Sequence, residues 1–217
     1  MFSGHYGVSF AAKRAEPSIP LWVLFLAVQC LDILWAPFIL TGIEKVRIVP
    51  HFTGTNALDL YYMPYSHSLV AAVFWSCVGG ILYQLMARPS RRQASVVVGL
   101  AVFSHWVLDL IVHVPDLPLY DNSAKVGMGL WNAPVLALCL EAALLLGGIW
   151  LCLREQLVRR GTLMFGVLML AIQAYNTFFA PPPTSDRAIA VTALIAYAMF
   201  AIVIWWLEDR RSITGTA

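Results

Sequence analysis

A histidine, an aspartate and a second histidine follow one another at four-residue intervals in an otherwise apolar stretch. They are His105, Asp109 and His113, in the segment SHWVLDLIVHVPDLP. An α-helix has 3.6 residues per turn, so steps of four rotate the side chain by only about 40° and keep all three on one face. Imidazole together with carboxylate is a typical ligand set for zinc, manganese or iron. The spacing therefore predicts one wall of a metal site.

The composition predicts that this helix lies in a membrane. Hydrophobic residues make up 60% of the 217 residues and charged residues only 12%, which is far from the balance of a soluble domain. We expect an all-α, polytopic transmembrane bundle formed by one integral membrane domain over residues 1–217. Residues 1–120 would carry the metal site and residues 121–217 would add supporting spans. The net charge of +2, without a basic face, predicts no nucleic-acid partner.

Six apolar stretches have the roughly 17 to 25 residues that a helix needs to cross a bilayer. They lie near residues 21–40, 67–87, 94–113, 133–153, 161–179 and 188–206. The segment MFSGHYGVSFAA before the first stretch is apolar but too short to cross. It is expected to lie at the interface or to enter the bundle as an N-terminal half-helix.

The basic residues predict the orientation of these spans. Ten of the 14 lysines and arginines fall into four clusters between alternate spans: Lys13 and Arg14; Arg88, Arg91 and Arg92; Arg154, Arg159 and Arg160; Arg210 and Arg211. By the positive-inside rule, these clusters and both termini face the cytoplasm, and the loops 41–66 and 114–132 face outward. A bacterial-type inner membrane is the expected location, with the lipid bilayer as the surrounding partner.

Depth within the bilayer indicates which other polar residues join the stripe. At about 1.5 Å per residue, Asp32 and His105 both lie roughly 12 Å below the outer boundary, and Asp109 lies near 6 Å. His67 opens the second span at that boundary, and a half-helix rising from Lys13 would bring His5 close to the same level. The predicted ligands of a divalent metal, zinc first and manganese or iron as alternatives, are therefore His5, Asp32, His67, His105, Asp109 and His113. A hydrogen-bonded packing network or a proton relay without metal is the alternative.

Three further groups of residues each allow two interpretations. Glu141 in the fourth span is either a general acid, base or ligand, or the acceptor of an interhelical hydrogen bond. His51 and Asp59 belong either to a solvated outer loop or to a lid over the site, and Asp116 either forms a turn or substitutes as a ligand. Trp131, with three other tryptophans near span ends, is expected in an interfacial aromatic belt.

Several short motifs resemble one family of membrane proteins. These are GHYG at the N-terminus, QCLDILW in the first span, YSHSL at 65–69 and SHWVLDL at 104–110. Together they are similar to the YdjM-like membrane-bound metal-dependent hydrolases, also described as LexA-binding inner-membrane hydrolases. The resemblance covers about the first 120 residues and implies a phosphoesterase-like metal centre. It matches His5, Asp32, His67, His105 and Asp109 to family motifs, whereas the family's second acidic residue near Asp32 and its Arg-Gly before the second histidine are missing here.

These observations lead to a hypothesis for function and two alternatives. The hypothesis is metal-assisted hydrolysis of an ester or phosphoester in a small amphiphilic substrate at the outer face, with Asp109, Asp32 and Glu141 as catalytic candidates. One alternative is a proton- or ion-coupled transporter that uses the His/Asp stripe. The other is a scaffold with a structural metal. The oligomeric state is left open.

Overall fold

Helices dominate the chain because long apolar runs can satisfy their main-chain groups in lipid only as helices. The computed structural model describes residues 1–87 and 92–214. Within these residues the elements are α1 (Ser3–Ala15), α2 (Leu21–Val28), α3 (Cys30–Leu40), β1 (Lys45–Ile48), β2 (Leu58–Tyr62), α4 (Leu69–Met86), α5 (Arg92–Val112), a 3₁₀ turn (Leu130–Asn132), α6 (Pro134–Arg154), α7 (Arg160–Phe178) and α8 (Asp186–Thr214). The all-α bundle predicted from the sequence is thereby confirmed.

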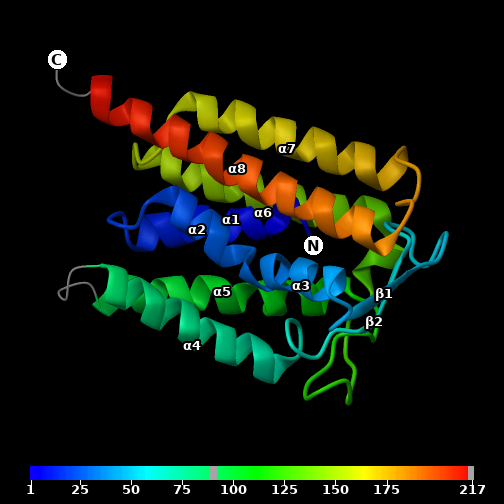
Figure 1. Cartoon of the computed structure of the whole chain (residues 1–217). Helices are drawn as coiled ribbons and strands as arrows, with labels where there is room; N and C mark the ends of the chain where they lie inside the picture. The colour runs from blue at the N-terminus through cyan, green and yellow to red at the C-terminus, as the bar shows by residue number, and fades with distance from the viewer. Residues whose placement is uncertain (88–91, 215–217) are drawn as a thin grey trace.

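Five of the described helices, α4 to α8, are long and apolar enough to cross a membrane. They coincide with five of the six predicted spans and run side by side (Figure 1). Their outward surfaces carry large apolar side chains such as Leu85, Leu100, Met164 and Ile202. Lipid is the environment in which such a surface is stable, so the chain has the character of a multi-pass membrane protein.

The first predicted span, 21–40, is a broken one. It consists of α2 and α3, which meet at Gln29 with a bend of 53°. Two main-chain carbonyls of α2 accept side-chain hydrogen bonds. Ser9 Oγ donates to Leu24 O at 3.2 Å, and His105 Nδ1 donates to Val28 O, at the end of the helix, at 2.7 Å. Because side chains from other helices satisfy these groups, the bend leaves them paired inside the bundle.

The N-terminal segment enters the bundle, as the half-helix interpretation predicted. The 13 residues of α1 lie between the spans, and the chain begins in the middle of the bundle (Figure 1). Along α1, Ser3, His5, Ser9 and Lys13 are all buried. Gly7 lies against α6 so closely that a Cβ there would meet the main chain of Leu144. This close approach allows a short helix to sit deep among longer ones.

The connections gather at the two ends of the bundle. The hairpin β1–β2, in which Lys45 pairs with Tyr62, lies at one end with the turns before α6 and α8 (Figure 1). The turns that follow α1 and α6 lie at the opposite end, together with the C-terminal end of α8. Of the predicted basic clusters, Arg88 and Arg91 fall outside the described residues, as do the side chains of Arg210 and Arg211.

Candidate metal centre

The stripe on α5 is buried and continuous. His105 Nε2 lies 3.1 Å from Asp109 Oδ2, and His113 Nε2 lies 3.7 Å from the same oxygen. His113 follows the last residue of α5, and its main-chain N–H continues the helix by donating to Asp109 O at 2.8 Å. The three side chains therefore share one face, with Asp109 between the two imidazoles.

Two other elements add one ligand each. Asp32 on α3 and His67, just before α4, meet the stripe with His67 Nε2 3.3 Å from Asp32 Oδ1. The distance from His105 Nε2 to Asp32 Oδ1 is 3.6 Å, and that from His67 Nε2 to Asp109 Oδ2 is 3.8 Å. Ligand atoms about 2.05 Å from a tetrahedral zinc lie about 3.3 Å from one another. The four measured distances, 3.1 to 3.8 Å, are near that value, and the ligand atoms that are all close to one another form two triads that share His105: His5, His105 and Asp109, and Asp32, His67 and His105.

The Nδ1 atoms of three histidines contact groups other than Asp32 and Asp109. His105 Nδ1 donates to Val28 O at 2.7 Å, and His113 Nδ1 donates to Asp116 Oδ1 at 2.8 Å. His67 Nδ1 lies 2.7 Å from Ser66 Oγ. A proton held on Nδ1 leaves the lone pair on Nε2, the nitrogen that faces Asp32 and Asp109. This is the arrangement in which metal-binding histidines are usually held.

Two hydrogen bonds from neighbouring residues also hold the main chain around His67. Ser68 caps α4, because its Oγ accepts the N–H of Ala71 at 3.1 Å. Trp106 on α5 donates its indole N–H to His67 O at 3.0 Å. The position of His67 is therefore set from both sides, by the start of α4 and by α5.

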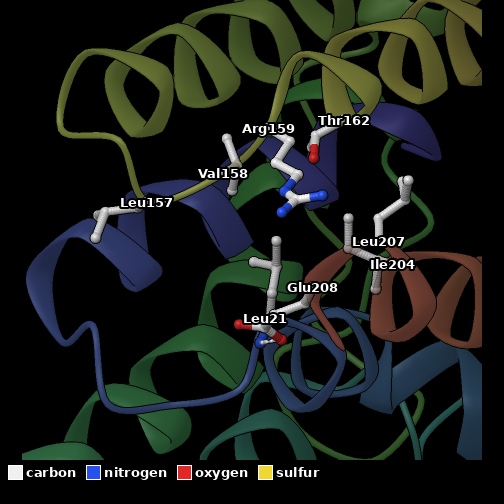
Figure 2. Close-up of a pocket in the computed structure, with 8 residues that line it drawn as sticks. All are labelled: Leu21, Leu157, Val158, Arg159, Thr162, Ile204, Leu207 and Glu208. Carbon is white, nitrogen blue, oxygen red and sulfur yellow. Dashed lines mark hydrogen bonds between the residues drawn. The ribbon is translucent and has the colours of Figure 1, made fainter. Parts of the chain in front are cut away.

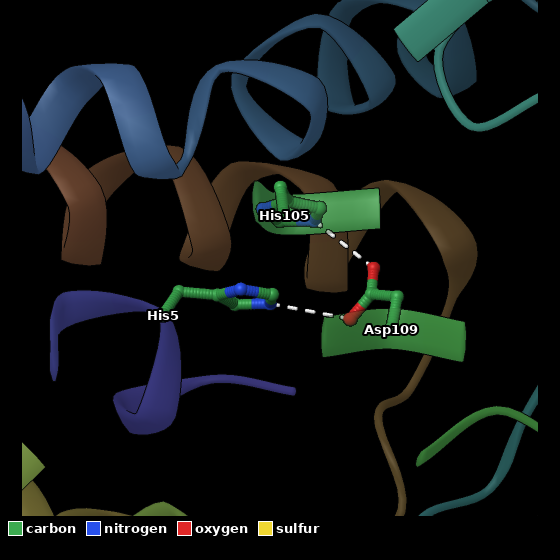
Figure 3. Close-up of side chains that lie close together, drawn as sticks. All are labelled: His5, His105 and Asp109. Carbon is green, nitrogen blue, oxygen red and sulfur yellow. Dashed lines mark ion pairs between the residues drawn. The ribbon is translucent and has the colours of Figure 1, made fainter. Parts of the chain in front are cut away.

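His5 reaches the cluster from α1. Its ring stacks on His105 with centroids 3.9 Å apart and 5° between the planes, and its Nε2 lies 3.2 Å from Asp109 Oδ1 (Figure 3). Neither ring nitrogen has a hydrogen-bond partner within the described part of the chain. The Met1 main-chain nitrogen donates to Asp109 Oδ1 at 2.8 Å. Asp109 thus presents Oδ1 to the N-terminal segment and Oδ2 to the histidines of the other elements.

Glu141 lies beside α1, and its contacts are those of a structural acceptor. Its Oε2 accepts from Phe2 N, Ser3 Oγ and Gly4 N at 2.9 to 3.1 Å, and its Oε1 accepts from Gln173 at 3.1 Å. The N–H groups at a helix start have no partner within the helix, so a buried carboxylate stabilises that end. These contacts favour the interhelical interpretation of Glu141 and connect α6 and α7 to the helix that carries His5.

The outer-loop candidates are placed differently. Asp59 on β2 forms an exposed ion pair with Arg47 on β1, 2.5 Å apart, and His51 lies in the exposed turn between these strands. Asp116 is buried against His113 as described above. Trp131, expected in an interfacial belt, instead packs on the ring of His113 with centroids 4.2 Å apart. The indole ring therefore packs against the buried imidazole of His113.

Two residues that contact the cluster or its neighbours carry no signal in the sequence. Tyr197 on α8 donates its hydroxyl to Asp32 Oδ2 at 2.6 Å. Glu44, just before β1, accepts the hydroxyl of Ser66 at 2.6 Å. Burial raises the pKa of Glu44 above its usual value. The sequence alone does not indicate a role in the site for a single tyrosine in an apolar span or a single acid in a loop.

Exposure within the cluster is confined to one side. Asp32 has a side chain that is 19% exposed, whereas those of the other five members are at most 4% exposed. The pocket in Figure 2 lies elsewhere, where Leu21, Arg159 and Glu208 meet near the turn that follows α6. Glu208 is already paired there, with Lys13 Nζ and Leu21 N, each at 2.7 Å. Within the cluster itself, Asp32 is therefore the most exposed member.

The fold and the cluster together define a multi-pass α-helical membrane protein with buried His/Asp groups that could hold a metal ion. No family model, curated protein or solved structure matches this chain. The resemblance to the YdjM-like hydrolases stays a prediction from the short motifs alone.

Proposed function

We propose that Asp32, His67, His105 and Asp109 bind one divalent cation, with His113 and His5 at its margin. The observation that carries this proposal is the orientation of the imidazoles, with Nδ1 groups bonded outward and Nε2 atoms directed at two carboxylates. Two carboxylates that face the Nε2 atoms of several imidazoles in a largely buried site also form a cluster whose negative charge a divalent cation would offset. Zinc is the first candidate, because neutral imidazole and carboxylate ligands suit it, with manganese or iron as alternatives.

We further propose that the protein is a membrane-bound, metal-dependent hydrolase related to the YdjM-like family. A divalent cation held by these residues would supply an activated water and polarise the scissile ester or phosphoester. Asp32 is the partly exposed member, and Tyr197 holds its Oδ2, so Asp32 is placed to orient the water and substrate. Asp109 bridges the histidines and maintains their positions. An amphiphilic ester is the proposed substrate, because the cluster is surrounded by spans with lipid-facing outer surfaces.

The proposed topology has both termini on the cytoplasmic side of a bacterial-type inner membrane. The loop clusters that include Arg14, Arg154 and Arg159 would then face the cytoplasm, with the hairpin β1–β2 outside. In this orientation the cluster lies in the outer half of the bilayer, and substrates would come from the outer leaflet.

One observation favours ion or proton transport as a second candidate. The span α2–α3 is interrupted beside the His/Asp cluster and the half-helix α1 begins there, and transporters often build their sites from interrupted helices. In that case the cluster would bind the transported ion, and flux would persist in proteoliposomes treated with a chelator at a concentration that strips zinc.

Turnover assays on the purified, reconstituted protein separate the two candidates. The substrates are a short-chain phosphatidic acid, a nitrophenyl phosphodiester and a nitrophenyl carboxylic ester, each with zinc, manganese or iron. We expect hydrolysis of at least one, its loss on chelation, and a fall in Asp109→Asn of more than the roughly 10- to 100-fold that outer-shell changes cost. Asp59→Asn, in the exposed hairpin, is the control and should retain turnover. Chelator-resistant flux without hydrolysis would overturn the hydrolase proposal.

A further inference from the structure

A chain of three buried side chains leads from the cluster to the outer loop. His67 Nδ1 lies 2.7 Å from Ser66 Oγ, and Ser66 Oγ lies 2.6 Å from Glu44 Oε2. All three residues are at most 3% exposed. The chain continues outward from the nitrogen of His67 that faces away from Asp32 and Asp109.

The other contacts of Glu44 set the direction of the hydrogen bonds. Its Oε1 accepts the main-chain N–H groups of Tyr65 and Ser66, both at 2.8 Å, so the carboxyl group acts as an acceptor. Ser66 Oγ donates to Glu44 Oε2 and is left with a lone pair for its next neighbour. With Glu44 ionised, His67 Nδ1 donates to Ser66, which puts the lone pair of the ring on Nε2. The polarity of the chain is thus fixed at Glu44.

Glu44 is also well placed to hold both ends of the outer loop. It follows α3, which carries Asp32, and its main-chain N–H donates to Phe38 O at 3.1 Å. Ser66 and His67 stand at the other end of the same loop, just before α4. One acid therefore links the element that carries a carboxylate of the cluster to the residue that carries an imidazole.

We propose that Glu44 is a positioning residue that acts through Ser66 to keep His67 in the tautomer that presents Nε2 to the cation. This inference rests on the proposed metal centre and assigns a role to two residues outside it. A carboxyl group that orients a metal-bound imidazole also makes it a better donor, and loss of such a partner typically weakens metal affinity by about 10- to 100-fold.

A role limited to shaping the loop makes a different prediction. Glu44 would then act only by holding the N–H groups of Tyr65 and Ser66, and the hydroxyl of Ser66 would be dispensable. The amide in Glu44→Gln retains an oxygen for those N–H groups but turns an N–H toward Ser66 Oγ. Ser66 then directs its hydrogen at His67 Nδ1, which moves the ring proton to Nε2. The isosteric variant therefore separates the two roles.

The test measures zinc affinity by chelator competition, together with the visible spectrum of the cobalt-substituted protein. We expect Glu44→Gln and Ser66→Ala to bind zinc about 10- to 100-fold more weakly than the wild type and to show an altered cobalt spectrum. Ser66→Thr keeps a hydroxyl and should restore affinity. Asp59→Asn, the matched control from the same loop, should bind as the wild type does.

The outcomes distinguish this inference from the proposed function. A wild-type protein that binds zinc, with unchanged affinity and spectrum in both Glu44→Gln and Ser66→Ala, would overturn the role of Glu44 and leave the metal centre intact. If Glu44→Gln fails to fold, Ser66→Ala decides alone, because it leaves both main-chain contacts of Glu44 in place. A folded wild type that binds no divalent cation would overturn the proposed function and this inference with it.

Discussion

The imidazole rings of His5 and His105 stack face to face, 3.9 Å between centroids, although 100 residues separate them in the chain. His5 comes from the half-helix α1 and His105 from the spanning helix α5. The contact depends on α1 entering deep into the bundle. A mutation that displaces α1 should therefore move His5 relative to His105 and change metal binding at the cluster.

The first prediction concerns the packing of α1 on α6. A Cβ at Gly148 would meet the main-chain oxygen of Gly7, whereas a Cβ at Gly147 would have open space. We expect Gly148→Ala to destabilise the protein by about 1–3 kcal/mol through overpacking and to weaken metal binding by moving His5. Gly147→Ala, the adjacent control, should be neutral or stabilising by up to about 1 kcal/mol. Thermal unfolding in detergent and zinc titration measure both, and equal behaviour of the two variants would contradict this packing.

The second prediction assigns Glu141 to stability. Glu141→Ala removes the acceptor of four hydrogen bonds and leaves buried donors at the start of α1 unpaired. Hydrogen bonds to charged groups are each worth about 1.5–3 kcal/mol, so we expect a loss of about 3 kcal/mol or more in unfolding free energy. Gln173→Ala removes only one of these contacts and should cost less, about 1.5–3 kcal/mol. If Glu141→Ala instead abolished turnover at full stability and full metal content, Glu141 would be a catalytic residue.

The third prediction concerns the pH dependence of stability at Glu44. Burial raises the pKa of Glu44 above its usual value of 4.5. A raised folded-state pKa contributes stability that is fully present below the unfolded pKa and is lost as the pH rises through the folded one. Glutamine does not titrate, so the melting temperature of metal-free Glu44→Gln minus that of the wild type should become more positive as the pH rises above about 4.5 and through the raised pKa of Glu44. A difference that stays constant, or moves the other way, would contradict the burial of an ionisable group there.

Helical periodicity and position along a predicted span were the two features of the sequence that indicated candidate residues of the site. A four-residue spacing on a helix places His105 and Asp109 on one face whatever surrounds them. Bilayer thickness then limits where Asp32 and His67 can lie, because each is counted from a span end. The structure brings these four side chains together, but the contacts of Asp32 and His67 with the α5 pair cross between elements and depend on packing that neither rule describes.

Other features depend on contacts between elements and could not be read from the chain. The 53° bend at Gln29 occurs without proline or glycine at that position, and Ser9 and His105 bond the carbonyls of Leu24 and Val28 from other helices. Tyr197 and Glu44 resemble an ordinary aromatic and an ordinary loop acid. Trp131 has the type and position of a belt residue, but the turn that precedes α6 folds it onto His113.

The most direct test of the central proposal is the metal content of the detergent-purified protein, measured by plasma mass spectrometry. Wild type, His105→Ala and Asp109→Ala should be compared at matched folding, with Asp59→Asn as the control. A single cation shared by the ligands of the cluster predicts about one equivalent in the wild type and the control, and none in the two cluster variants. A well-folded wild type that contains no zinc, manganese or iron, even after reconstitution, would contradict the metal centre.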